Sequence, residues 1–286
     1  MHPHRQEVEA ALLANIYNPH FDQVVIFLDR EFVKGSEVCH HFRIKMKNLS
    51  LRLFRMTEDE VDKFLWSKLT CVDVYSGQPT YYQMFKNAVS DYVKGDIVVM
   101  ANADQVFDET MAYARHLHPE VLAAIGTRGY TDLISADADY YYKEIVGRVH
   151  PQYLEPDNMK ERAPDNCINI PGSVDTWIFH KSKLKDTLRP EPFQRRNRGG
   201  KLEYFYMNQN QAENAALWAL NDCYQFESYY NACDKIHSWH FHLTPKTHHE
   251  ETKTWHRVPA PYMNPRKEGG SKCAQEGFCF LLNPVP

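Results

Sequence analysis

Short hydrophobic runs alternate along the chain with segments whose apolar residues recur every three or four positions. A continuous apolar run with β-branched members is typical of a strand buried on both faces, whereas the wider spacing is typical of an amphipathic helix. Strands are therefore expected at residues 24–28, 44–54, 69–75, 96–101, 122–125, 176–179 and 235–242. Helices are expected at residues 7–17, 57–66, 80–92, 108–116 and 211–221, the second of them opened by a capping box.

This alternation of strands and helices predicts an α/β fold with a mainly parallel central sheet flanked by helices. The 286 residues suit one large domain, and the sequence has neither an internal repeat nor a long linker. We expect a single domain over residues 1–250 and an irregular tail, residues 251–286, that packs on or near the active site. Residues 126–170 are expected to be irregular, and residues 189–200 to form a mobile loop.

The most hydrophobic strand runs directly into two polar residues, Asn102 and Asp104. In open α/β sheets, ligands bind just beyond the carboxyl ends of such strands. Two oxygen-bearing side chains there suit a hard divalent cation, which in turn suits a diphosphate. The alternative is a polar strand end capped by Asp104. The segment at residues 137–139 fits a D-x-D form better, but no core strand precedes it, so it is expected to be a solvated loop.

Two further carboxylates are candidates for chemistry. Glu213 lies in the first turn of a predicted helix, where the helix dipole favours its ionised form, so it can take a proton from a sugar hydroxyl. Asp175 stands at the entry to a strand beside Trp177, a pairing that suits a sugar because the indole can pack on the ring. The alternatives are a Glu that serves only its helix and an Asp that caps a turn.

Histidines cluster in the last predicted strand. Because alternate residues of a strand share a face, His240 and His242 face the same side and can offer imidazole to a metal, while His237 faces the other. A structural zinc site is poorly supported, since the chain has no H-E-x-x-H motif. The alternative is a packed, hydrogen-bonded histidine.

Composition narrows the class of protein. Hydrophobic residues make up 43% and charged residues 24% of the chain, and the net charge of −4 argues against a partner that is a nucleic acid. No apolar run approaches the roughly 20 residues that cross a bilayer, and the N-terminus has no signal-peptide core. The seven cysteines form no CxxC pair, although Cys273 and Cys279 can bridge, so we expect a reduced, cytoplasmic protein.

Seven segments, in this order and spacing, resemble a family of glycosyltransferases with the GT-A fold, including those of algal viruses and microbes. They are the first helix and strand (7–28), a Pro-Thr-Tyr turn (79–81), an Asn-x-Asp end followed by Phe-Asp (102–108), a Thr-Arg-x-Tyr segment (127–130), an Asp-x-Trp-x-Phe strand (175–179), an acidic-Asn helix start (213–214) and a His-x-His strand (240–242).

The resemblance implies a GT-A-like, Rossmann-like single domain that transfers a hexosyl or pentosyl group from a UDP- or GDP-sugar. The acceptor is a hydroxyl of a glycan or glycoconjugate, the reaction is inverting, and Mn²⁺ or Mg²⁺ assists it. By the same resemblance Glu213 is the base, and Asp175 orients the acceptor or is the alternative base. The implied nucleotide-binding residues are Pro79, Thr80, Asn102, Ala103, Asp104 and Arg128, and the implied metal ligands are Asp104, Asn102, His240 and His242.

Two departures from the family pattern stand out. Asn102 replaces the usual first acidic residue of the D-x-D form, which implies weak metal affinity or a dispensable metal. The helix start has Glu213-Asn214 where an acidic pair is common.

Two alternative functions stay open. A nucleotidyltransferase of related fold needs a Gly-rich phosphate loop after the first strand, and residues 29–35 contain a single glycine. A catalytically inactive sugar- or nucleotide-binding protein is the second alternative, motivated by Asn102.

Overall fold

The structure, a computed structural model, describes residues 3–29, 38–54, 56–75, 79–125, 130–132, 145, 174–196, 202–207, 212–224, 226, 228–232 and 235–242. The helices are α1 (Pro3–Tyr17), α2 (Val38–Leu53), α3 (Glu58–Lys68), α4 (Tyr81–Ala88), η1 (Glu109–His116), α6 (Lys181–Lys185), η4 (Glu191–Phe193), α7 (Ala212–Trp218) and η5 (Ala219–Cys223). The strands are β1 (Val24–Asp29), β2 (Leu69–Tyr75), β3 (Ile97–Ala101), β4 (Gln105–Phe107), β5 (Val121–Ile125), β6 (Tyr130–Asp132), β7 (Thr176–His180), β8 (Gln194–Arg196), β9 (Leu202–Tyr204), β10 (Ser228–Asn231) and β11 (Ser238–His242).

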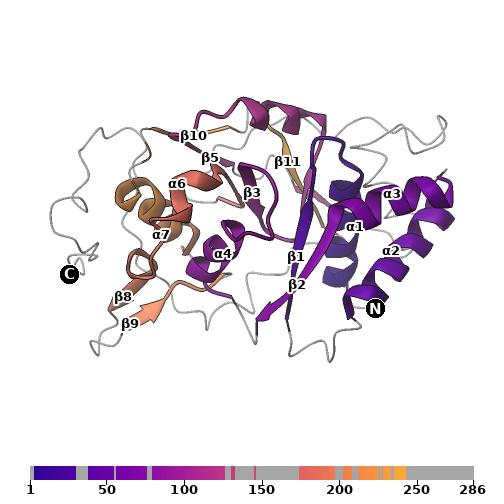
Figure 1. The fold of residues 1–286 in the computed structure, drawn as a ribbon, viewed down its shortest axis with the longest axis horizontal. Helices are drawn as coiled ribbons and strands as arrows, with labels where there is room; N and C mark the ends of the chain where they lie inside the picture. Colours follow the sequence, from indigo (N-terminus) through magenta and orange to yellow (C-terminus); the bar gives the residue numbers. More distant parts are fainter. Residues whose placement is uncertain are drawn as a thin grey trace.

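A four-stranded sheet in the order β10-β5-β7-β3 lies at the centre of the molecule (Figure 1). Strand β10 runs parallel to β5, whereas β7 runs antiparallel to both of its neighbours, β5 and β3. Elsewhere β1 pairs in parallel with β2, and β11 lies between an antiparallel β4 and a parallel β6. The expectation of a mixed helix-and-strand fold is confirmed. The described pairings are mixed rather than mainly parallel, because the buried strand β7 enters the sheet in the opposite direction.

Strand β7 is buried on both faces, as its continuous apolar run predicts. Trp177 and Phe179 pack in a core formed with α4 and α7, and Ile178 packs in a second core with Phe107 and Met111. Strand β3 is different: Val98 and Met100 are buried, but the alternate residues are only partly covered, and β3 forms one edge of its sheet within the described part.

The first three helices form a separate hydrophobic core. Helices α1, α2 and α3 gather at one end of the molecule, on the far side of β1 and β2 from α4 and α7 (Figure 1). Leu13 and Ile16 of α1 meet Met46 of α2 and Leu65 of α3 in this core. Val106 of β4 also packs in this core, so the turn that follows β3 leads into it.

The expected strand at residues 44–54 is wrong, because this segment is the second half of α2. The buried positions are Met46, Leu49, Ser50 and Leu53, which have the three-and-four spacing of one helix face. The apparent alternation of leucines over residues 49–53 misled the sequence-based interpretation.

The other long elements follow the sequence pattern. The predicted capping box forms, with Thr57 at the start of α3, and a second one, which was not predicted, has Thr80 at the start of α4. Predicted helix 108–116 is a 3₁₀-helix capped by Asp108. Short elements escaped prediction: β4, α6 and β10 were missed, and part of the expected loop at residues 189–200 is η4 and β8. The expected tail at residues 251–286 lies outside the described residues.

The expectation of reduced cysteines is wrong for the described cysteines. Cys39, at the start of α2, and Cys71, in β2, form a disulfide whose Cα atoms are 5.8 Å apart. Cys223, in η5, is also disulfide-bonded. Spacings between nearby cysteines could not predict this pair, because Cys39 and Cys71 are 32 residues apart in the sequence. They meet because α2 begins beside β2. The expected bridge between Cys273 and Cys279 lies outside the described residues.

Crossing a bilayer as a helix requires about 20 apolar residues. Of the helices that the structure describes, none has the length and apolar character that this requires.

Candidate functional site

The site begins at the carboxyl end of β3, where the chain turns back into β4. The backbone N–H of Gln105 donates a hydrogen bond to the carbonyl of Asn102 across this turn, at 3.2 Å. Ala103 is exposed at the tip, and Asn102 and Asp104 are both partly buried. The turn therefore presents two polar side chains at the edge of the sheet.

Asp175 lies beside Asn102 because of the way β7 enters the sheet. The backbone N–H of Asn102 donates to the carbonyl of Asp175 at 3.0 Å, and the backbone N–H of Asp175 donates to the carbonyl of Ile125 at 3.1 Å. The Asn102 side-chain amide Nδ2 also donates to Asp175 Oδ1, at 3.0 Å. Asp175 is thus held between the carboxyl ends of β3 and β5, where open α/β sheets bind ligands.

Glu213 approaches the same point from the first turn of α7. Burial raises the pKa of its carboxyl to about 7, its own backbone N–H opposes the rise, and the charge of Asp175 adds to it. The two carboxylates, one just before β7 and one in α7, therefore lie within electrostatic range of each other. A carboxyl with this pKa exchanges protons near neutral pH, which is the property that a general base needs.

Tyr81, the first residue of α4, faces the two carboxylates. Burial, and then the charges of Glu213 and Asp175, raise the pKa of its hydroxyl well above the usual value. Its ring packs edge-on against Trp177, with 5.4 Å between centroids. Sequence reasoning included Tyr81 only as part of a turn motif. Its place beside both carboxylates follows from the packing of α4 on β7.

Trp177 does not have the role that the sequence suggested. Its side chain is fully buried between Tyr81 and Phe85, so no sugar ring can stack on it. Residues 175 and 177 are two positions apart and so face the same side of the chain. At residue 177, however, α4 covers that side. The expected pairing of Asp175 with an exposed indole is wrong.

Pro79 and Thr80 are tied to the segment that leads into α7. The carbonyl of Pro79 accepts a hydrogen bond from the backbone N–H of Met207 at 3.0 Å, and the backbone N–H of Tyr81 donates to the carbonyl of Phe205 at 2.9 Å. Thr80 forms a β-bridge with Tyr206. These bonds place the start of α4 next to the segment that precedes Glu213.

Asp104 meets His240 of β11. Their Oδ2 and Nε2 atoms are 2.9 Å apart, and both side chains are about 15% exposed. A carboxylate and an imidazole at one point are donors that Mn²⁺ accepts. His242 also belongs to β11, but its side chain lies outside the described part. Nowhere among the described residues do three His, Cys, Asp or Glu side chains gather in a way that holds a metal ion.

A second aspartate–histidine pair, missed from the sequence, lies at the other end of the β4–β11 ladder. Asp108 Oδ2 is 3.0 Å from His237 Nδ1, and this contact, together with the hydrogen bonds from Thr110, lowers the pKa of Asp108 against the effect of burial. Between the two pairs, Ser238 Oγ donates to Gln105 Oε1 at 2.6 Å. The pair fixes β11 on β4 and so keeps His240 beside Asp104.

Not every predicted site residue can be placed. Arg128 and the alternative acidic segment at residues 137–139 lie outside the described residues. Of the implied site, the structure brings together Asn102, Asp175 and Glu213, with Asp104 and His240 in the adjoining turn and strand.

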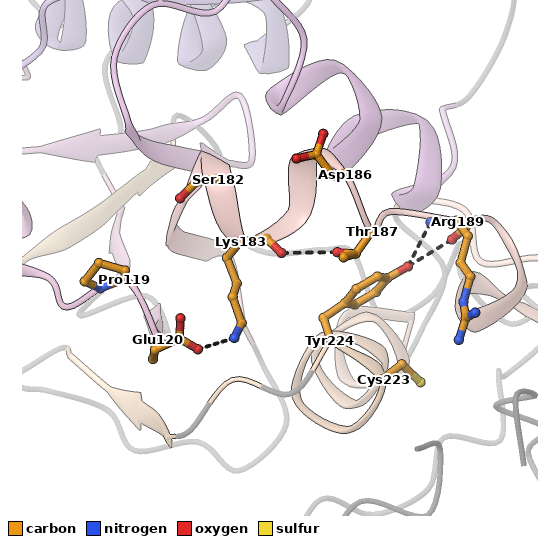
Figure 2. A pocket seen from close by; sticks show the side chains of 9 residues that line it. All are labelled: Pro119, Glu120, Ser182, Lys183, Asp186, Thr187, Arg189, Cys223 and Tyr224. Carbon is orange, nitrogen blue, oxygen red and sulfur yellow. Dashed lines mark hydrogen bonds and ion pairs between the residues drawn. The ribbon is translucent and has the colours of Figure 1, made fainter. Parts of the chain in front are cut away.

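A cavity of about 690 Å³ lies at the amino end of β5, the opposite end of that strand from Ile125 and Asp175 (Figure 2). Its lining comes from the amino end of β5, from α6 and from η5. Lys183 pairs with Glu120, and the Tyr224 hydroxyl bonds to the backbone of Arg189, so these polar groups bind one another. The cavity contains none of the residues that the sequence singled out.

Compared with known proteins, the sequence matches no protein-family model and no curated protein. The likeness to GT-A glycosyltransferases therefore stays a prediction from the seven segments, and the site has to be assessed on its own chemistry.

Proposed function

We propose that the chain is an inverting glycosyltransferase that moves a sugar from a nucleotide-diphosphate sugar to a hydroxyl of a glycan or glycoconjugate. One observation supports the proposal above all others. Asn102, Asp175 and Glu213, from three distant segments, lie together beyond the carboxyl ends of β3 and β5, and the Glu213 carboxyl has a pKa of about 7.

Glu213 acts as the general base. Its carboxylate accepts the proton of the acceptor hydroxyl while the hydroxyl oxygen forms a bond to the anomeric carbon and the bond from that carbon to the diphosphate oxygen breaks. The buried position of the carboxyl keeps its proton affinity high enough for this transfer near neutral pH. Asp175 accepts hydrogen bonds from the acceptor and so orients it for in-line attack.

Asp104 and His240 are the described residues that would hold Mn²⁺ or Mg²⁺. When bound, such an ion offsets the negative charge that develops on the diphosphate leaving group. Pro79 and Thr80, joined to the segment before Glu213, border the nucleotide of a UDP- or GDP-sugar donor.

The test combines a donor panel with two substitutions. UDP- and GDP-sugars, each with and without Mn²⁺, are screened for a rise in Tm and for slow donor hydrolysis. With the active donor, Glu213→Gln is expected to lower the transfer rate by roughly 100-fold or more while nucleotide binding persists. Asp104→Ala is expected to abolish donor turnover. Glu58→Gln, at an exposed position of α3, is the matched control and leaves the rate unchanged.

Three results would contradict the proposal. A near-normal transfer rate in the Glu213→Gln variant would show that Glu213 is not the general base. A product that retains the anomeric configuration of the donor removes the inverting mechanism. A Tm that no UDP- or GDP-sugar shifts, together with an absence of hydrolysis, removes the transferase function.

A further inference from the structure

Asn102 directs its polar groups to a neighbouring residue rather than to open space. Its backbone N–H and its side-chain Nδ2 both donate to Asp175, each at 3.0 Å, one to the backbone carbonyl and the other to Oδ1. Its own carbonyl accepts from Gln105 across the turn. The two residues are 73 positions apart in the sequence, so this double contact is a product of the tertiary fold.

The backbone of Asp175 is fixed on two sides, by Asn102 of the β3 end and by Ile125 of the β5 end. The remaining freedom of Asp175 is the rotation of its side chain. The Asn102 amide removes that freedom, because a hydrogen bond to Oδ1 selects one orientation of the carboxylate.

We propose that Asn102 is a positioning residue, whose amide orients the Asp175 carboxylate beside Glu213, and that this is why position 102 holds an amide. The inference rests on the proposed function for its catalytic consequence. It differs from the role as metal ligand that the Asn-x-Asp form implies, because it uses the side-chain nitrogen, which donates to Asp175, whereas a metal would bind the amide oxygen.

The chemistry of the side chain explains the choice of residue. An amide carries both a donor and an acceptor, whereas an ionised carboxylate only accepts hydrogen bonds. An aspartate at position 102 would therefore place oxygen against Asp175 Oδ1 and lose the bond that the amide makes. Restoring the D-x-D form by Asn102→Asp is expected to harm the enzyme rather than improve it.

The test uses Asn102→Asp and Asn102→Ala in the full chain, with the same two substitutions at Asn48, an exposed position of α2, as controls. With the active donor, both Asn102 variants are expected to lower kcat by roughly 10- to 100-fold. The KM for the donor and the Mn²⁺ concentration for half-maximal activity are expected to stay within about twofold, since a 1 Å misplacement alters the reacting geometry more than binding. The Asn48 variants keep the original kcat.

A metal-ligand role gives the opposite result. The Asn102→Asp variant then reaches half-maximal activity at a lower Mn²⁺ concentration and keeps or raises kcat, and either outcome overturns the proposal.

A second measurement separates this proposal from the proposed function. Crystal structures of the two Asn102 variants are expected to show the backbone in place and the Asp175 carboxylate turned to another rotamer or divided between two. A carboxylate that keeps its orientation in both variants overturns the positioning role, whether or not the protein transfers sugar. A turned carboxylate in a protein that has no transferase activity overturns the proposed function and leaves the positioning role standing.

Discussion

The fold raises the pKa of the Glu213 carboxyl from about 4.5 to about 7, chiefly by burying it and to a smaller extent by placing it near the charge of Asp175. Between these two pH values the folded protein binds more protons at this carboxyl than the unfolded chain does. The free energy of unfolding that the group contributes is therefore complete below about pH 4.5 and is lost as the pH rises through about 7. The same burial that suits Glu213 to accept a proton makes the folded state less stable at alkaline pH.

We predict that Glu213→Gln removes this dependence. On going from pH 5 to pH 8, the variant should lose roughly 2–3 kcal/mol less unfolding free energy than the original protein, and it should be the more stable of the two at pH 8. Urea unfolding at both pH values measures this, with Glu58→Gln as a control that keeps the original dependence. An unchanged pH dependence in Glu213→Gln would show that the carboxyl is not buried as described.

At the scale of elements, the chain contains two capping boxes of the same design in different settings. Thr57 caps α3 at an exposed position, whereas Thr80 caps α4, is buried and forms a bridge with Tyr206. In both, the threonine oxygen accepts from the backbone of the residue three positions on, and that residue's side chain bonds back. Substituting the two capping threonines in parallel therefore distinguishes an effect on helix stability from an effect on the geometry of the site.

We predict that Thr57→Ala and Thr80→Ala each lower the free energy of unfolding by about 1 kcal/mol, because each loses one cap. Only Thr80→Ala is expected to raise the KM for the donor several-fold, since Thr80 precedes Tyr81 at the start of α4 and lies beside the segment that leads to Glu213. Urea unfolding and donor titration of both variants measure the two effects. Equal donor KM values in the two variants would show that this end of α4 does not border the nucleotide.

At the scale of the whole molecule, a disulfide links α2 to β2, which pack in the same hydrophobic core. Cys39 and Cys71 connect the start of α2, in the core of the first three helices, to β2 across 32 residues of sequence. Disulfides persist in oxidising compartments and are rare in the cytosol. The pair therefore favours an oxidising compartment over the cytoplasm that the sequence suggested.

We predict that the double substitution Cys39→Ser with Cys71→Ser lowers the free energy of unfolding by roughly 3–4 kcal/mol, because the unfolded chain regains the entropy of an open loop of this length. Urea unfolding without a reducing agent gives this loss. Adding a reducing agent to the double variant then reports on the disulfides that remain, including the bond that Cys223 makes. A double variant as stable as the original protein would contradict the structural role of the bridge.

The sequence by itself determined the features that depend on neighbours a few positions apart. Strand-like apolar patterns predicted β1, β2, β3, β5 and β7, helical spacing predicted α1, α3 and α4, and a capping box marked the start of α3. It also selected Asn102, Asp175 and Glu213 as candidates, because each is a polar residue at the end of a strongly patterned element. Such patterns are local because hydrogen bonds in helices and alternation in strands repeat over two to four residues.

The tertiary structure alone decided what those residues contact. Local alternation could not show that Met46, Leu49 and Leu53 share a helix face against α1, that Cys39 meets Cys71, or that Trp177 is covered by α4. The bond from Asn102 to Asp175 and the contact of Asp104 with His240 depend on the antiparallel entry of β7 and on the pairing of β11 with β4. These contacts join residues far apart in the sequence, and the path of the chain through the cores brings them together.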